Sequence, residues 1–338
     1  MMRSLLLAAI VVLAAAVPGT AQQNLDVVRL TLNPSTFAYL PLFTAVDRGY
    51  FAEQHIDLQI TKISGSSIQQ LPRLARGDID IMPTSIGPGF FNQYAQGFDA
   101  KIVASFNQSH AGWQDPACIL VRQELWDNLA IAKLADLRGK NVDGGADGTS
   151  LNFMVKAALA KGGLTTKDVQ FTERFRAIPD AFAAFKNGAA DVQAMTEPLC
   201  TQWDLDHVAH RWLTAQDVIP GFQPSYIAAG GTYLRDHRAV IVRFLTAFLK
   251  GARDVTNAKG HWTPVLVASA AKWTEIPQAT LERLAGPSYV GQMGAIDTGW
   301  IDRQQRFWLA EGTVSKAAPL ADIIDASLLD EARRAVGR

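Results

Sequence analysis

The sequence predicts an α/β protein built from two related lobes. From residue 27 onward, short runs rich in β-branched residues alternate with amphipathic segments of helix length, separated by Gly and Pro, which is typical of largely parallel sheets. A second observation is an internal repeat. Gly77 and Gly188 each end a predicted helix and are followed by Asp at the third position, an apolar strand and a hydroxyl residue at the eighth. A chance match is the alternative, because a helix that stops at Gly before a strand occurs in any α/β protein.

The first half of the chain carries three predicted strands and two predicted helices. Strands are predicted at residues 27–32, 57–62 and 79–82, and helices at 40–54 and 67–76. In the second helix the apolar residues Ile68, Leu71 and Leu74 recur at helical intervals before Gly77, which indicates one buried face.

The second half opens with strands and closes with helices. Strands are predicted at residues 118–122, 141–143 and 226–230, with a helix at 151–161 that stops at Gly162. Beyond His237 the chain is mainly helical, and helices are expected at 240–255, 263–272, 278–284, 299–311 and 320–336. We expect these last hundred or so residues to return and cover the first lobe.

Residues 1–21 have the pattern of a secretory signal peptide. Arg3 is followed by an apolar run over residues 5–17, and Gly19 and Ala21 are small residues at the positions that precede cleavage before Gln22. A membrane anchor is the alternative, but the run is shorter than the roughly 20 apolar residues that span a bilayer. The pattern therefore predicts a chain exported across the cytoplasmic membrane.

Charge and cysteine content narrow the function classes. Lys+Arg and Asp+Glu both total 32, so no net basic field favours binding to nucleic acid. An oxidising compartment would allow Cys118 and Cys200 to pair, and two separate buried thiols are the alternative, because spacing in sequence does not give a distance between side chains.

Signals of catalysis are weak. The sequence has no nucleophile elbow, zinc-protease motif, phosphate-binding loop or dinucleotide fingerprint, so we expect no enzyme activity and no cofactor. One cluster has metal-ligand residue types, namely Asp204, Asp206, His207 and His210, in which His207 and His210 at i,i+3 could share a helix face. Without a third organised ligand, a His pair is more often part of a solvated surface than a metal site.

Signals of ligand binding are stronger. Gly148, Thr149 and Ser150 stand at the start of a predicted helix, where free N–H groups and hydroxyls form a cradle for an anionic head; the alternative is a simple helix cap. Loops that follow strands in open α/β sheets bind ligands, and here they carry small hydroxyl and amide side chains in both halves, at residues 34–39, 64–66, 83–85, 107–109 and 196–198. Ordinary turn chemistry favours the same residue types.

These motifs, in order, resemble those of the periplasmic substrate-binding proteins of ABC importers, in the branch that binds nitrate, sulfonates, taurine and thiamine-pyrimidine precursors. The residues that carry the resemblance are Leu40-Pro41-Leu42-Phe43, Asp47-Arg48-Gly49-Tyr50-Phe51, the segment 77–85, Asp136-Leu137-Arg138-Gly139-Lys140, Gly148-Thr149-Ser150 and the segment 188–198. The resemblance covers nearly all of the chain after residue 21.

The resemblance implies a type II periplasmic binding fold, with two α/β lobes joined by a two-segment hinge around a ligand cleft. Lobe 1 would comprise residues 22–107 and 235–338, and lobe 2 residues 108–234. The binding positions that it implies are Ser35, Thr36, Phe37, Tyr39, Ser64, Gly65, Thr84, Ser85, Asn107, Thr149, Ser150, Thr196, Glu197 and Tyr226.

It also implies a monomeric, periplasmic, non-enzymatic protein that closes on a small organic ligand and delivers it to a membrane permease. An organic sulfonate, carboxylate or N-heterocycle fits better than bare nitrate. Glu197, if it faces the cleft, would repel an anion, whereas Arg174 and Arg176 are candidates for an anion clamp. Two alternatives stay open, namely an accessory sensor for a membrane kinase and an enzyme of pyrimidine biosynthesis with a similar fold.

Overall fold

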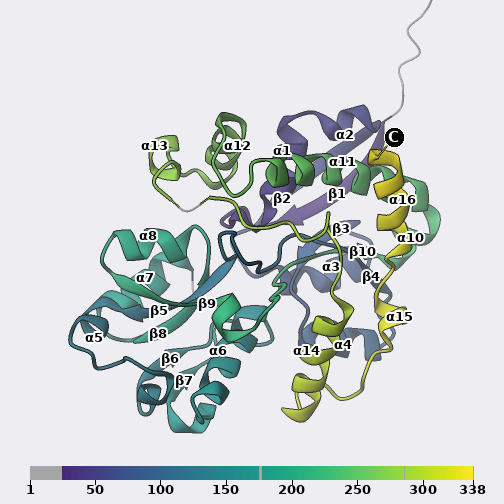
Figure 1. The fold of residues 1–338 in the computed structure, drawn as a ribbon. Coiled ribbons are helices and arrows are strands. Elements are labelled where there is room, and N and C mark those ends of the chain that lie inside the picture. Colours follow the sequence, from purple (N-terminus) through teal and green to yellow (C-terminus); the bar gives the residue numbers. More distant parts are fainter. Residues whose placement is uncertain (1–24, 175–176, 285, 338) are drawn as a thin grey trace, which may run out of the picture.

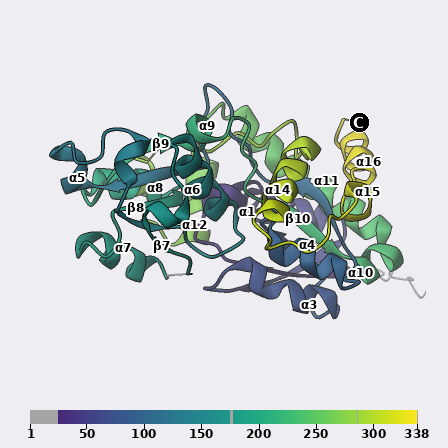
Figure 2. The ribbon, with the colours of Figure 1, turned by 90° about the horizontal axis from the view of Figure 1, so that it is seen from below.

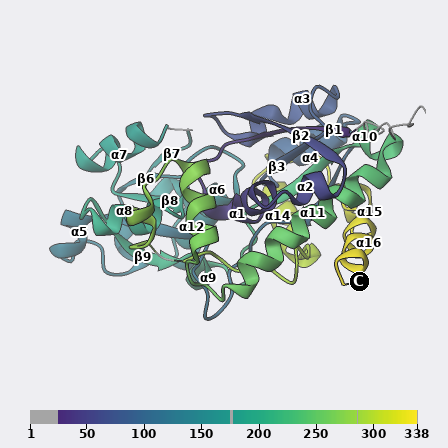
Figure 3. The ribbon, with the colours of Figure 1, turned by 90° about the horizontal axis from the view of Figure 1, so that it is seen from above.

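The computed structural model describes residues 25–174, 177–284 and 286–337. They form two lobes, each built on a five-stranded sheet with helices around it (Figure 1). Seen from below and from above, the lobes lie side by side, with α5 (Gln123–Asp127) at one end of the molecule and α16 (Ser327–Val336) at the other (Figures 2 and 3). The predicted signal peptide, residues 1–21, lies outside the described residues. Among these residues, no helix has the length and apolar composition needed to cross a bilayer.

The first sheet has the strand order β2-β1-β3-β10-β4. Strand β1 runs parallel to β2 and β3, whereas β10 runs antiparallel to β3 and β4. All four residues of β3 are buried, as expected for a central strand covered on both faces. The bounds are Asp26–Leu32 for β1, Ile56–Lys62 for β2, Ile81–Thr84 for β3, Ala100–Ser105 for β4 and Tyr226–Gly230 for β10.

The second sheet repeats this plan with the order β7-β6-β8-β5-β9. Strand β6 is parallel to β7 and β8, and β5 is antiparallel to β8 and β9. The bounds are Ala117–Arg122 for β5, Asn141–Asp143 for β6, Gln170–Thr172 for β7, Val192–Thr196 for β8 and Ala209–Thr214 for β9.

The Asp of the internal repeat makes the same contact in both lobes. Asp80, just before β3, accepts a hydrogen bond from the backbone N–H of Arg29 in β1 at 2.8 Å, and Asp191, just before β8, accepts one from the N–H of Asn141 in β6 at 3.0 Å. Each carboxylate also pairs with an arginine, Arg29 or Arg122. The repeat is therefore structural, and its Asp ties two neighbouring parallel strands together in each lobe.

Helices of the first lobe follow the predicted pattern with shorter pieces. The expected helix 40–54 is divided at Gly49, whose φ of 75° ends α1 (Leu40–Asp47) before α2 (Tyr50–Glu53). The expected helix 67–76 is a 3₁₀ turn at Ser67–Gln70 followed by α3 (Leu71–Ala75). The long helix α11 (Arg238–Asn257) packs on α1 and α16 in one apolar core over the first sheet. The other helices around this lobe are α4 (Pro88–Ala95), α10 (Gly231–Asp236), α12 (Pro264–Thr274), α13 (Gln278–Leu281), α14 (Thr298–Ala310) and α15 (Leu320–Ile323).

In the second lobe, helices lie on both faces of the sheet. Residues of α6 (Ser150–Lys161) belong to a core cluster that continues into the first lobe, whereas α7 (Ile178–Lys186) and α8 (Leu199–Leu205) pack on the other face. The short helix α9 (Ala215–Val218) follows β9.

Two segments connect the lobes, residues 106–116 and 219–225, and they run beside each other. The backbone N–H of Phe106 donates to the carbonyl of Ser225 at 3.0 Å, and that of Ser109 donates to the carbonyl of Phe222 at 2.8 Å. The second segment leads directly into β10. The expectation that lobe 2 continues to Leu234 is therefore wrong for β10, since this strand bonds to β3 and β4 of the first sheet.

The C-terminal helices cover the first lobe, as expected, but α14 also reaches the second. The ring of Trp300 in α14 makes edge contacts with Phe153 of α6, at a centroid distance of 5.3 Å, and with Phe222 of the connecting segment, at 5.5 Å. At the other end of α14, the half-exposed Glu311 lies 3.5 Å from the ammonium group of the buried Lys156 of α6. Helix α14 therefore spans the junction of the lobes.

Cys118 and Cys200 form a disulfide, with a Cα–Cα distance of 6.0 Å and a sequence separation of 82. The bond links β5 to the start of α8, and both residues are fully buried. The sequence left open whether these cysteines form a disulfide or remain two separate thiols, and the structure shows the disulfide.

Replacing both cysteines by Ser should lower the free energy of unfolding by about 4 kcal/mol, because the bridge restricts a long loop in the unfolded chain. Urea unfolding of the double variant beside the oxidised wild-type chain measures the difference. Equal midpoints and slopes for the two proteins would contradict the stabilising role of the bridge.

Candidate functional site

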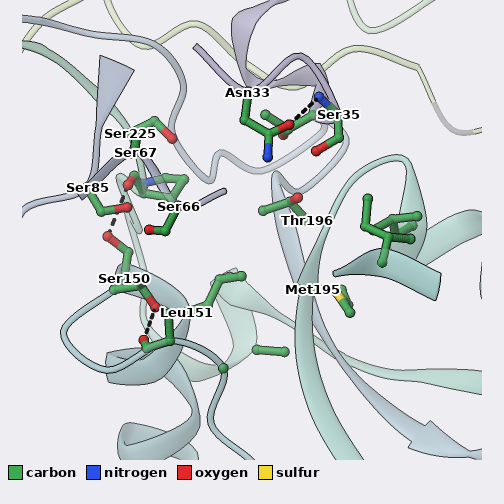
Figure 4. A pocket seen from close by; sticks show the side chains of 18 of the residues that line it. Asn33, Ser35, Ser66, Ser67, Ser85, Ser150, Leu151, Met195, Thr196 and Ser225 are labelled. Atoms are coloured by element: carbon green, nitrogen blue, oxygen red, sulfur yellow. Dashed lines mark hydrogen bonds between the residues drawn. The ribbon is translucent and has the colours of Figure 1, made fainter. Parts of the chain in front are cut away.

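A cavity of about 440 Å³ lies between the two lobes. Its walls come from loops after the strands of both sheets, from the starts of α6 and α7, and from the connecting segment at Pro224 and Ser225 (Figure 4). Both the position and the volume are typical of a small-molecule site. The lining residues are Asn33, Ser35, Thr36, Tyr39, Ser64, Gly65, Ser66, Ser67, Ser85, Gly145, Ala146, Thr149, Ser150, Leu151, Ala177, Ile178, Pro179, Gln193, Ala194, Met195, Thr196, Leu199, Pro224 and Ser225.

The wall from the first lobe is rich in hydroxyl groups. It is formed by the loops that leave the carboxyl ends of the parallel strands β1, β2 and β3. Asn33 connects two of these loops, since its Oδ1 accepts from the N–H of Ser35 at 3.1 Å and its Nδ2 donates to the carbonyl of Gly65 at 3.3 Å. Figure 4 shows Ser66, Ser67 and Ser85 on the same side of the cavity. This wall presents rotatable O–H groups that can donate or accept.

The wall from the second lobe begins at the N-terminus of α6. The hydroxyl of Thr149 caps the helix by accepting from the N–H of Asn152 at 3.1 Å, and it donates to the carbonyl of Ala146 at 2.9 Å. The hydroxyl of Ser150 donates to the carbonyl of Pro224 at 3.0 Å. The helix cap expected from the sequence is present, and it lies on the cavity.

Apolar side chains complete the second-lobe wall. Leu151, Ile178, Pro179, Met195 and Leu199 line the cavity from α6, from α7, from β8 and from α8. The cavity therefore combines a hydroxyl-rich wall with an apolar wall, an arrangement that can orient a ligand with one polar end and one apolar end.

Most of the predicted binding positions line this cavity. They are Ser35, Thr36, Tyr39, Ser64, Gly65, Ser85, Thr149, Ser150 and Thr196. The other five are buried beside it. Phe37 packs edge-on against Trp262 at 5.2 Å, Thr84 donates to the carbonyl of Ser85 at 2.9 Å, and Asn107, Glu197 and Tyr226 lie in the interior at 3% exposure or less.

The Glu197 carboxylate points into the second lobe rather than into the cavity. Its Oε1 accepts from Gln114 Nε2 at 2.7 Å and Thr201 Oγ1 at 3.0 Å, and it lies 3.2 Å from the Arg211 guanidinium. Burial raises the pKa of this carboxyl, against the opposite influence of Arg211 and the hydrogen bonds. Glu197 is therefore a paired interior charge, and the condition under which it would repel an anionic ligand, namely that it faces the cleft, is not met.

The lobes touch each other beside the cavity. The Glu197 carbonyl of lobe 2 accepts hydrogen bonds from the N–H of Phe37 at 3.1 Å and from the Thr36 hydroxyl at 3.3 Å. Gly87 and Gly148, one from each lobe, approach so closely that a Cβ on Gly87 would lie 1.7 Å from the Gly148 carbonyl oxygen. The structure thus shows the lobes in contact around the cavity.

Comparison with known families identifies the chain. The sequence model described as "NMT1/THI5 like" matches residues 36–259, a span that includes the first-lobe wall from Thr36 onward and the whole second lobe. The chain belongs to the NMT1/THI5-like family. No curated protein sequence matches the chain at a significant level.

Solved structures with a similar fold include periplasmic binding proteins and an enzyme. The alkanesulfonate-binding protein SsuA from Xanthomonas axonopodis pv. citri, bound to MOPS, has a TM-score of 0.66 at 19% identity, over 90% of this chain and 97% of that chain. The periplasmic nitrate-binding protein NrtA from Synechocystis PCC 6803 has a TM-score of 0.70 at 15% identity, over 92% and 89%. A mutant of the desulfurization enzyme DszB, in complex with biphenyl-2-sulfinic acid, has a TM-score of 0.64 at 13% identity, over 92% and 99%. This NMT1/THI5-like chain thus has the two-lobed fold of periplasmic binding proteins.

Sequence reasoning missed several lining residues of this family member. Asn33 directly follows β1 and precedes the predicted loop 34–39, and Ser67 directly follows the predicted loop 64–66. Loops predicted one residue longer would have contained both. Ile178, Pro179 and Leu199 gave no signal, because apolar side chains at helix starts are most often core.

Other candidate residues lie elsewhere. Arg174 is exposed outside the lining, and Arg176 lies outside the described residues. His207 follows α8 while His210 is on β9, so the pair shares no helix face. Within the described ranges, no group of three or more His, Cys, Asp or Glu is placed to hold a metal ion.

Replacing Glu197 by Ala should lower the free energy of unfolding by about 3 kcal/mol, because it leaves the Arg211 charge partly buried without its partner. Replacement by Gln should cost less, since an amide oxygen still accepts from Gln114 and Thr201. Urea unfolding measures both effects. If both variants instead keep wild-type stability and lose ligand binding, the assignment of Glu197 to the interior is refuted.

Proposed function

We propose that this chain is the solute-binding component of an ABC importer, which holds a small organic ligand between its lobes and presents the closed form to a membrane permease. The observation that carries the proposal is the cavity lined by both lobes and by one of the segments that connect them. A ligand that contacts both lobes binds the closed arrangement better than an open one, and so it shifts the population toward closure.

The cavity supports an organic ligand rather than a bare inorganic ion. Its volume of about 440 Å³ exceeds what a small ion fills, and its apolar wall would gain little from such an ion. Two of the fold relatives support this, since one is an alkanesulfonate-binding protein bound to MOPS and another holds biphenyl-2-sulfinic acid, whereas a third is a nitrate-binding protein. Organic sulfonates, carboxylates and N-heterocycles are the classes we propose, with capture in the periplasm by a monomer after cleavage near Ala21.

A thermal-shift screen of refolded protein tests this function. Protein that comprises residues 22–338 is first denatured and dialysed to remove any retained ligand. It is then refolded and exposed to a library of sulfonates, aromatic carboxylates, pyrimidines and nitrate. A ligand at 100 times its Kd should add about 2.7 kcal/mol of stability. Mass spectrometry of the recovered ligand distinguishes a binding protein from an enzyme, because a binding protein releases the ligand chemically unchanged. Failure of folded protein to respond to the whole library contradicts the proposal, and co-purification with a membrane kinase instead of a permease favours the sensor alternative.

Gly87→Ala should weaken ligand binding by opposing closure. The φ of −167° at Gly87 is extended backbone that Ala also adopts, so the fold itself tolerates the substitution, but the new methyl group would collide with Gly148 across the lobes. Small-angle scattering with the ligand found in the screen should show a larger radius of gyration for this variant than for the wild-type chain.

Gly337→Ala is the matched control, because a Cβ there meets only the Arg333 carbonyl oxygen, at an ordinary 3.5 Å. Closure of the Gly87→Ala variant to the wild-type radius, with unchanged affinity, would show that the Gly87 contact does not belong to the ligand-bound state.

A further inference from the structure

Gln193 is a buried amide with an unused acceptor on the wall of the cavity. It lies in β8, is 5% exposed, and lines the cavity with Met195, two residues further along the same strand. Its Oε1 is buried without a hydrogen-bond partner in the part of the chain that the structure describes. A buried amide oxygen without a partner destabilises the folded state, because it has lost its water and gained nothing in return.

Three other polar side chains on the cavity wall differ from Gln193 because hydrogen bonds within the protein satisfy them. Asn33, Thr149 and Ser150 each have partners within the protein. Some buried atoms elsewhere, such as Oγ1 of Thr31 and of Thr44, also lack a partner, but these residues do not line the cavity. Gln193 therefore combines an unsatisfied acceptor with space for a ligand to satisfy it.

We infer that Gln193 is a specificity-determining residue that recognises an uncharged amide-type edge on the ligand, such as a carboxamide or a lactam. This inference rests on the proposed function of the cavity. A ligand N–H would donate to Oε1, and a neighbouring ligand carbonyl would accept from Nε2. The pairing works in either orientation of the Gln193 amide, because an edge that carries both N–H and C=O matches both orientations.

The surroundings favour a neutral donor over a cationic one. The second-lobe wall that carries this amide also presents Ile178, Met195 and Leu199 to the cavity. An ammonium group placed against apolar side chains loses hydration that one amide oxygen does not replace. A neutral N–H loses much less.

The test uses refolded protein and three probes, namely benzamide, N,N-dimethylbenzamide and benzoate. Isothermal titration of the wild-type chain should give saturable binding of benzamide, and binding about tenfold weaker for the dimethyl compound, which has no N–H, and for benzoate, whose charge would lie among apolar side chains. In Gln193→Leu, benzamide should bind about tenfold more weakly than in the wild-type chain, and the preference over the dimethyl compound should vanish. The matched control is Gln123→Leu, which removes another amide with an unpartnered Oε1 that lies on α5, away from the cavity.

Stability without ligand supplies a second readout. If Gln193 serves the ligand, Gln193→Leu should be as stable as the wild-type chain or more stable, since it removes a buried group without a partner. A less stable variant would mean that the amide has a structural role, and equal affinity of both proteins for benzamide would also overturn the inference. If library compounds stabilise the wild-type chain but benzamide does not bind, the Gln193 inference fails and the proposed function stands. If nothing binds, both fail.

Discussion

The position of β10 determines the arrangement of the whole molecule. This strand is inserted between β3 and β4, antiparallel to both, so the chain that left the first lobe after β4 must return to its interior. It therefore crosses twice between the lobes, through two segments whose backbones bond to each other at Phe106 and Ser225. Because the parallel strands of both sheets direct their carboxyl ends toward this crossing, the loops after them meet across one cavity. The site is a consequence of topology before any particular side chain is considered.

The sequence could predict these loops but not which side chain of each loop faces the cavity. Thr84 and Ser85 illustrate the limit. Thr84 is the last residue of β3, paired with Tyr226 in the ladder and buried, whereas its neighbour Ser85 lines the cavity. Successive residues of a strand point to opposite faces, so the choice between them depends on register. β3 pairs with β1 on one side and with β10 on the other, and β10 joins the sheet after more than a hundred intervening residues and was placed by the sequence in the other lobe.

Glu197 shows the same limit for charge. A carboxylate at the end of a strand, beside hydroxyl residues, has the sequence pattern of a ligand contact. Its partner Arg211 is on β9, a strand that the sequence analysis did not predict. The repeat, in contrast, was predictable, because both members of the pattern are local. Asp80 and Asp191 each stand three residues after a Gly and before a strand, so a short sequence window contains the pattern, although the backbone N–H groups that they bind, those of Arg29 and Asn141, lie 51 and 50 residues away.

Buried polar groups of the second lobe differ in whether a partner within the protein satisfies them. Buried carboxylates such as Glu197 and Asp191 are matched by an arginine within their own lobe, and these interior charges are thereby balanced without a ligand. The cavity side of the second lobe is different, because Gln193 lines the cavity and its Oε1 has no hydrogen-bond partner among the described residues. Its desolvation disfavours the closed arrangement without a ligand, and a ligand that supplies the missing hydrogen bonds recovers this free energy when the lobes close on it. An amide left without a partner at this position thus converts a small loss of stability into selectivity for ligands that carry the complementary groups.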